Sequence, residues 1–127
     1  MHLTYLFDPL CGWCYGAGPA IDDLANLPDV TFELAPCGLF MGDGRRMEPG
    51  LAQYILEADA RIARMTGQVF SDAYRANVLG EADGVIDSGA ATLGVLAAGL
   101  VTGCDADVTS RHCLACSRPP FDIRPAS

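Results

Sequence analysis

The 127-residue chain contains no lysine, so all eight of its basic residues are arginine, against sixteen acidic residues and a net charge of −8. This acidic balance argues against nucleic acid as a partner. The chain also lacks a long apolar run, because residues 89–101 form the longest and fall short of the roughly 20 that cross a membrane. No export signal opens the chain. We therefore expect a cytoplasmic protein without a membrane segment.

Half of the residues are hydrophobic, and no linker divides the chain, which predicts one compact domain. The six cysteines do not indicate a secreted disulfide scaffold, because no signal precedes them and the middle of the chain has helical periodicity. In a reducing compartment a CxxC motif is catalytic or metal-binding.

The first forty residues follow a strand–helix–strand order. Leu3–Phe7 and Val30–Leu34 are rich in aromatic and β-branched residues, and a helix is predicted over Gly12–Leu27. The apolar face of this helix is predicted to comprise Tyr15, Ile21, Leu24 and Leu27. A right-handed crossover makes the strands parallel and brings their carboxyl ends to one edge of the sheet. Cys11-Gly-Trp-Cys14 lies at that edge, where such sheets place their sites.

Residues 51–101 are predicted to be all helical. The first helix runs from Leu51 to a stop at Gly67, the second from Ser71 or Asp72 to Leu79, and the third from Ser88 to Leu100. The first carries a periodic apolar face of Leu51, Tyr54, Ile55, Ala58, Ile62 and Met65, and the third is expected to turn Leu93, Leu96 and Leu100 inward. Residues 1–103 thus form the structured part, and residues 104–127 are expected to be irregular.

The CxxC motif has the chemistry of a redox centre. Cys11 stands at the start of a predicted helix, where unpaired backbone N–H groups and the helix dipole favour its thiolate. Cys14 lies one turn further on and can close a disulfide against it. Gly12 permits a close approach of backbone, and Trp13 offers an apolar surface beside the sulfur. Asp8 opposes thiolate formation by its charge but can also accept a proton, so its role stays open.

Other readings of the cysteines remain. The motif resembles half of a zinc site, whose partner would be Cys113-Leu-Ala-Cys116, but the separation is far longer than in ribbon-like sites. A local metal set is conceivable in the tail, comprising Cys104, His112, Cys113 and Cys116, although a tail with unpaired thiols is favoured. Cys37 follows the second strand and is interpreted as a small buried hydrophobe rather than a third redox thiol.

The stretch Phe7-Asp-Pro-Leu-Cys-Gly-Trp-Cys-Tyr-Gly16 resembles the active-site signature of DsbA-like proteins with the thioredoxin fold, in particular the cytoplasmic FrnE-type branch. Pro19 matches the kinking proline of such active-site helices. The resemblance covers about residues 1–100 and implies an α/β thioredoxin-like fold with an all-helical insertion. It also implies thiol–disulfide exchange with protein or small-molecule thiols such as glutathione, with Cys11 as nucleophile and Cys14 as resolving cysteine, and it implies no metal or organic cofactor.

The chain departs from this family after the helical block, where two further strands and a last helix are expected. A cis-proline loop belongs to that missing half, and none of Pro119, Pro120 and Pro125 precedes a strand-like run. Two strands alone leave unpaired edges, which predicts marginal stability or a homodimer. The alternatives to an oxidoreductase are therefore a catalytically impaired fragment or interaction module, a glutathione-dependent transferase or isomerase, and a zinc-binding protein.

Overall fold

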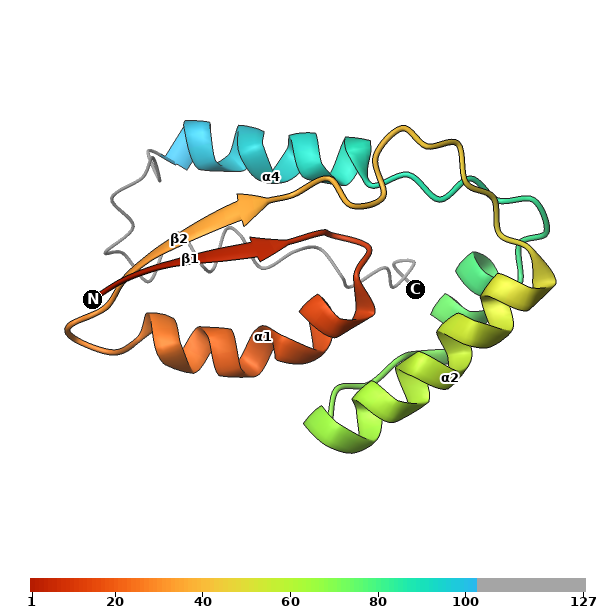
Figure 1. Ribbon diagram of the computed structural model, residues 1–127, viewed down its shortest axis with the longest axis horizontal. Coiled ribbons are helices and arrows are strands. Elements are labelled where there is room, and N and C mark those ends of the chain that lie inside the picture. The colour runs from red at the N-terminus through yellow and green to blue at the C-terminus, as the bar shows by residue number, and fades with distance from the viewer. Residues whose placement is uncertain (103–127) are drawn as a thin grey trace.

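The computed structural model describes residues 1–102 and begins with the predicted strand–helix–strand unit. Strand β1 (His2–Phe7) leads into α1 (Gly12–Ala25), and β2 (Thr31–Pro36) returns beside it. The sheet formed by these elements has two strands, which pair in parallel from His2 against Thr31 to Phe7 against Pro36. Helix α1 lies beyond β1 and α4 lies beyond β2, so the two helices flank the strand pair (Figure 1). The βα and αβ junctions follow the prediction closely.

Helix α2 (Pro49–Thr66) is the longest helix and packs against α1. Its start has proline at the first helical position, and its end has Gly67 in the left-handed region with φ of 75°, as the predicted stop requires. The buried side of α2 is centred on Asp59 and Ile62, whereas Tyr54 and Met65 are exposed, so the predicted apolar face was wrong at these two positions. The periodicity was right, but the buried stripe is narrower than the apolar stripe.

The contact between α1 and α2 depends on glycine. Gly16 is the buried residue of α1, and a Cβ at this position would lie 2.4 Å from Cγ2 of Ile62. Real Cβ atoms do not approach so closely, so the absence of a side chain lets the two helices meet. Ile62 is only 1% exposed. In contrast, Leu24 and Leu27, predicted to be inward, are 38% and 48% exposed because α2 covers only the first half of α1 (Figure 1).

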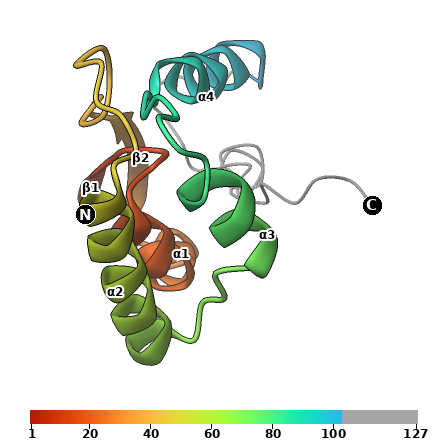
Figure 2. The same ribbon diagram turned by 90° about the vertical axis from the view of Figure 1, so that its right-hand side faces the viewer.

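The second predicted helix exists with a changed pitch. Ser71 caps α3 (Asp72–Tyr74) by accepting a hydrogen bond from the backbone N–H of Tyr74 at 3.1 Å. The chain then widens into the π-helical turn η1 (Arg75–Leu79). Figure 2 shows α3 beside α2, on the side away from the first strand. The cap was predicted from sequence, and the π-turn was not.

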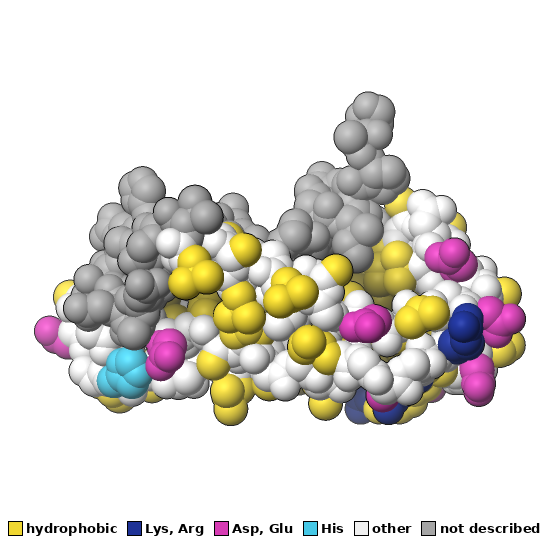
Figure 3. Space-filling view, turned by 90° about the horizontal axis from the view of Figure 1, so that it is seen from above, with side chains coloured by type: hydrophobic (Ala, Val, Ile, Leu, Met, Phe, Trp, Pro, Cys, Tyr) yellow, Lys and Arg dark blue, Asp and Glu magenta, His cyan; other side chains and the backbone are white. Residues whose placement is uncertain are grey.

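Helix α4 (Gly89–Thr102) matches the predicted span, but the prediction that Leu93, Leu96 and Leu100 point inward was wrong. These side chains are 64%, 48% and 76% exposed. The more buried positions carry small side chains, Ser88 and Thr92 above all. The face of the molecule that carries α4 consequently shows a group of hydrophobic side chains (Figure 3). In a helix that is apolar all round, periodicity does not indicate which side packs.

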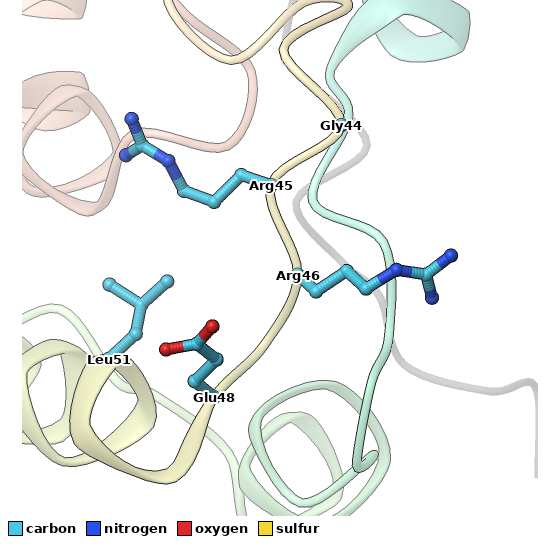
Figure 4. Close-up of a pocket in the computed structure, with 5 residues that line it drawn as sticks. All are labelled: Gly44, Arg45, Arg46, Glu48 and Leu51. Carbon is cyan, nitrogen blue, oxygen red and sulfur yellow. The ribbon is translucent and has the colours of Figure 1, made fainter.

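The loop between β2 and α2 is irregular, and backbone hydrogen bonds join it to the segment before α4. Met47 N–H donates to Gly84 O and Ile86 N–H to Arg45 O, each at 2.8 Å. An open hollow of about 500 Å³ lies on this loop, lined by Gly44, Arg45, Arg46, Glu48 and Leu51 (Figure 4). The two guanidinium groups point away from each other, so their charges do not converge on a common ligand.

No helix among residues 1–102 is long and apolar enough to cross a membrane. The predicted irregular tail, with Cys104, His112, Cys113, Cys116 and its prolines, lies outside the described residues.

Candidate active site

Cys11 and Cys14 stand where β1 gives way to α1. Cys11 is the N-cap residue, with φ of −80° and ψ of 112°, and its carbonyl accepts the first helical hydrogen bond from Tyr15 N–H at 3.0 Å. A turn precedes it, in which Cys11 N–H donates to Asp8 O at 3.0 Å. Both thiols are partly buried and neither is in a disulfide. The structure thus brings the two predicted redox residues into one helical turn.

The environment separates the acidities of the two thiols. Hydrogen bonding from the Cys14 thiol lowers the pKa of Cys11 to about 6, helped by the backbone N–H groups of Cys14 and Trp13, while burial and the Asp8 charge oppose it. The same thiol–thiol contact, together with burial, raises the pKa of Cys14 far above its ordinary range. At neutral pH Cys11 is therefore the thiolate and Cys14 holds the proton. These are the states of an attacking and a resolving thiol.

Tyr5 is a site residue that was not predicted. It lies on β1, and its ring stacks on Phe7 at 5.9 Å between centroids and tilts against Phe32 at 6.4 Å. Its hydroxyl donates to the Cys14 carbonyl at 3.5 Å. Burial, followed by the Cys14 charge, raises the pKa of Tyr5, so the hydroxyl keeps its proton. The period-2 pattern of β1 places Tyr5 on the inward face, which is the signal that could have found it.

Asp8 links three segments of the chain through hydrogen bonds to its carboxylate. It is 1% exposed, and its carboxylate accepts hydrogen bonds from Leu10 N–H at 2.8 Å, Phe40 N–H at 3.1 Å and Ser88 Oγ at 2.7 Å. These donors come from the turn before Cys11, the loop after β2 and the start of α4. The carboxylate therefore joins three segments at the carboxyl edge of the sheet, and its role, left open by the sequence, is to fix the turn that presents Cys11.

Gly12 faces α2 within the same chain. A Cβ at Gly12 would lie 3.0 Å from Oδ1 of Asp59 and 3.3 Å from Cδ1 of Ile62. Asp59 is 3% exposed, and its Oδ2 has no hydrogen-bond partner among the described residues. Burial raises the pKa of Asp59, whereas a hydrogen bond from Tyr74 and the charge of Arg75 oppose the rise. A buried acid thus lies under the first turn of the cysteine helix, and the sequence analysis did not identify it.

Trp13 is 45% exposed, which leaves a large apolar surface next to the sulfurs. The Arg61 guanidinium lies 5.6 Å from its ring centroid, a cation–π distance. Glu57, one turn before Arg61 on α2, accepts a hydrogen bond from Gln53 at 2.8 Å. One edge of the site is therefore formed by the Trp13 indole, against which the Arg61 side chain of α2 packs.

Pro19 lies inside α1 and cannot donate the backbone hydrogen bond that residue 15 would receive. Gln68 supplies a replacement, because its Nε2 donates to the Tyr15 carbonyl at 3.1 Å. Tyr15 in turn donates its hydroxyl to Val69 O at 2.9 Å. The loop after α2 thus compensates for the proline in α1, because two of its residues form hydrogen bonds with Tyr15.

Cys37 does not have the predicted burial. It is exposed, because it follows the last residue of β2 and its backbone N–H, rather than its side chain, is anchored, donating to Phe7 O at 2.8 Å. His2 is exposed, and its Nε2 lies 3.4 Å from a carboxylate oxygen of Glu33. Within residues 1–102 no group of three or more His, Cys, Asp or Glu side chains is arranged to hold a metal ion. The predicted metal set in the tail lies beyond these residues.

Comparison with solved structures identifies the fold. The chain is similar to the cytosolic disulfide reductase DsbM from Pseudomonas aeruginosa, with 32% identity and a TM-score of 0.71 over 90% of this chain and 60% of that one. The same reductase with GSH gives 31% identity and a TM-score of 0.70 over 90% and 61%. A candidate protein disulfide isomerase from Nitrosomonas europaea gives 24% identity and a TM-score of 0.69 over 94% and 54%.

The chain therefore spans about 60% of the length of the reductase that it matches. No family model matches the sequence, and no curated protein does. The structural neighbours nevertheless carry the names of disulfide-exchanging proteins, in agreement with the chemistry of the two thiols.

Proposed function

Because the chain has the DsbA-like thioredoxin fold, we propose that it is a thiol–disulfide oxidoreductase that works through Cys11 and Cys14. The observation that carries the proposal is the divided acidity of the pair, in which the pKa of Cys11 is lowered to about 6 and that of Cys14 is raised. A thiolate at the helix start and a protonated thiol one turn later are the two forms that disulfide exchange requires.

The reaction has two exchange steps. The Cys11 thiolate attacks one sulfur of a substrate disulfide, a mixed disulfide forms, and the other substrate sulfur leaves as a thiolate. Cys14 then loses its proton and attacks the Cys11 sulfur, which closes the Cys11–Cys14 bond and releases the second substrate thiolate. Two electrons pass from the two cysteines to the substrate, one released thiolate takes up the Cys14 proton, and the other exchanges its proton with solvent.

The supporting residues have distinct proposed roles. Asp8 fixes the turn before Cys11 through its three hydrogen bonds, and Trp13 offers an exposed ring on which a substrate can pack. Gly12 and Pro19 shape α1 so that α2 and the following loop support it. The site as proposed needs no metal and no organic cofactor, since the sulfurs carry both electrons.

The cytosolic reductase with GSH supports a reducing direction, with glutathione as the thiol that restores the dithiol and with a cytoplasmic location. The Cys-Gly-Trp-Cys signature supports assignment to the FrnE-type branch. Protein disulfides are the proposed substrates, because the exposed Trp13 ring suits a polypeptide.

A glutathione redox titration with alkylation and peptide mapping tests the proposal on the full chain. We expect one two-electron transition in a Cys11–Cys14 bridge, at a potential between about −270 and −120 mV. Cys11→Ser is expected to lower disulfide turnover by more than about 100-fold. Cys37→Ser is the matched control, because it removes an exposed thiol from the same sheet edge and is expected to preserve turnover.

Two outcomes would overturn the proposal. If Cys11→Ser protein exchanged disulfides at the parent rate, Cys11 would be excluded as the nucleophile. Scattered mixed disulfides on all six cysteines would favour the fragment or interaction module, for which the exposed leucines of α4 are the supporting observation.

A further inference from the structure

Of the two thiols, Cys14 is the more difficult to deprotonate. Its proton is held tightly, because the contact with Cys11 and burial both raise its pKa. Yet Cys14 must become a thiolate to resolve the mixed disulfide, and it must leave as a thiolate when glutathione reopens the bond. A hydrogen-bond donor at the Cys14 sulfur would assist both steps, since thiolates accept strong charge-assisted hydrogen bonds.

The Tyr5 hydroxyl lies beside Cys14. It donates to the Cys14 carbonyl at 3.5 Å, a long contact for an O–H donor, so this bond does not fully engage the proton. Hydrogen bonding with Tyr5 also opposes the rise in the pKa of the Cys14 thiol, so the hydroxyl acts on the side chain of Cys14 as well as on its carbonyl. The ring stacks on Phe7 of β1 and tilts against Phe32 of β2, the strand that pairs in parallel with β1. The hydroxyl is thus pre-positioned under the resolving thiol.

We propose that Tyr5 is a further catalytic residue, whose hydroxyl donates a hydrogen bond to the Cys14 sulfur and stabilises its thiolate as the Cys11 bond forms or breaks. The hydroxyl keeps its proton throughout. In resolution, the proton of Cys14 passes through solvent to the departing substrate thiolate, and the Cys14 thiolate forms the new S–S bond. In the reverse direction a glutathione thiolate attacks Cys11, and Cys14 departs with the electron pair into the hydrogen bond from Tyr5. This inference rests on the proposed function.

The other groups that act on Cys14 are few in the described part of the chain. Cys11 acts on it directly, and the backbone of Asp8 lowers its pKa. The Asp8 carboxylate acts on Cys11. Because Asp8 is engaged by Leu10, Phe40 and Ser88, Tyr5 is the side chain available to respond to charge on Cys14.

Tyr5→Phe keeps the ring and its stacking and removes only the hydroxyl. The first measurement is the lifetime of the mixed disulfide between Cys11 and glutathione after reaction of the full chain with oxidised glutathione. We expect formation at the parent rate and resolution about 10-fold slower, the effect of one hydrogen bond to a charged group. Tyr15→Phe is the matched control, because Tyr15 follows Cys14 on α1 and its hydroxyl donates to Val69 O in the loop after α2. It is expected to leave resolution unchanged.

A second measurement does not need exchange activity. In full-length Cys11→Ser protein, the pH dependence of Cys14 alkylation, followed by peptide mapping, reports its thiolate. Tyr5→Phe is expected to move the midpoint to higher pH and lower the thiolate fraction at a given pH about 10-fold. Equal midpoints in folded Tyr5→Phe and Tyr5 protein would overturn the inference. If the midpoint shifts but the parent chain forms no Cys11–Cys14 bridge in the redox titration, the proposed function is refuted. The contact between Tyr5 and Cys14 would then still be supported.

Discussion

The two helices that flank the strand pair are held in opposite ways. Helix α1 meets α2 where the 1% exposed side chain of Ile62 packs directly on the backbone of the buried Gly16. Helix α4 leaves its three leucines 48–76% exposed and has small residues at its more buried positions. The helix that carries the cysteines is therefore the more closely packed of the two. A redox pair needs fixed geometry, and the packing of α1 supplies it.

Gly16→Ala compared with Gly94→Ala is the strongest test of that contrast. The new Cβ at Gly16 lies 2.4 Å from Ile62 Cγ2, whereas nothing lies within 4 Å of one at Gly94. We expect Gly16→Ala to lower the free energy of unfolding by about 1–3 kcal/mol through overpacking. Gly94→Ala is expected to raise it by about 0.5–1 kcal/mol, because alanine favours the helix. Denaturant unfolding measures both, and equal effects would mean that α1 is no better packed than α4.

Ser88→Ala tests what holds α4. The variant removes the 2.7 Å hydrogen bond to the buried Asp8 carboxylate and is expected to cost about 1–2 kcal/mol. Hydrogen exchange is expected to accelerate in α4 and to stay at the parent rate in the middle of α1. Thr4→Val is the control, because its hydroxyl bonds to Glu33 on an exposed surface. Unchanged exchange in α4 would show that this tie does not anchor the helix.

Asp59 makes the packing between α1 and α2 sensitive to pH. Burial raises its pKa in the folded chain, so the neutral acid is favoured there, and the stability that it contributes is present below its unfolded pKa of about 4 and lost as pH rises. Asp59→Asn is therefore expected to gain stability relative to the parent as pH rises from 3 to 7, by on the order of 1 kcal/mol.

The control for Asp59 is Glu57→Gln, an exposed position on the same helix, whose difference from the parent is expected to change little over this range. Thermal unfolding at a series of pH values measures both differences. An Asp59→Asn difference that stays flat or falls with rising pH would contradict the raised pKa.

Gln68 is expected to give the smallest effect. Gln68→Ala leaves the Tyr15 carbonyl without the side-chain donor that compensates for Pro19 and is expected to cost about 0.5–1 kcal/mol. In a Pro19→Ala background, residue 19 regains its own N–H, so the same change is expected to cost less. A double-mutant cycle by denaturant unfolding measures the coupling. Strict additivity would show that Gln68 does not replace the missing donor.

Much of the framework was predictable from sequence because its signals are local. The strand–helix–strand order, the parallel pairing and the Gly67 stop follow from alternation, from the crossover rule and from glycine at a helix end. The orientation of α4 was not predictable in the same way. Its sequence is apolar on nearly all sides and its buried Thr92 is polar, so which side packs is decided by tertiary contacts that periodicity does not encode.

The site was predictable to the extent that it lies within one stretch of sequence. The spacing of Cys11 and Cys14 identifies them as a redox motif in the sequence. The groups that surround them come from β1 and α2, which are distant from the motif in the sequence or carry no such pattern. Asp59 interrupts the apolar stripe between Ile55 and Ile62, which is a visible sign of a buried acid in retrospect. That it would lie under Gly12 depended on how α2 crosses α1, and this was not encoded locally.

The chain has a single tryptophan, Trp13, which lies between the two cysteines in the sequence and has the Arg61 guanidinium over its ring. Indole emission is quenched by a neighbouring disulfide and altered by a neighbouring thiolate. The fluorescence of the unlabelled protein is therefore an optical readout of the state of its own sulfurs. The exchange proposed at Cys11 is therefore expected to be measurable in real time by fluorescence without a dye, because the chain has no second indole to obscure the signal.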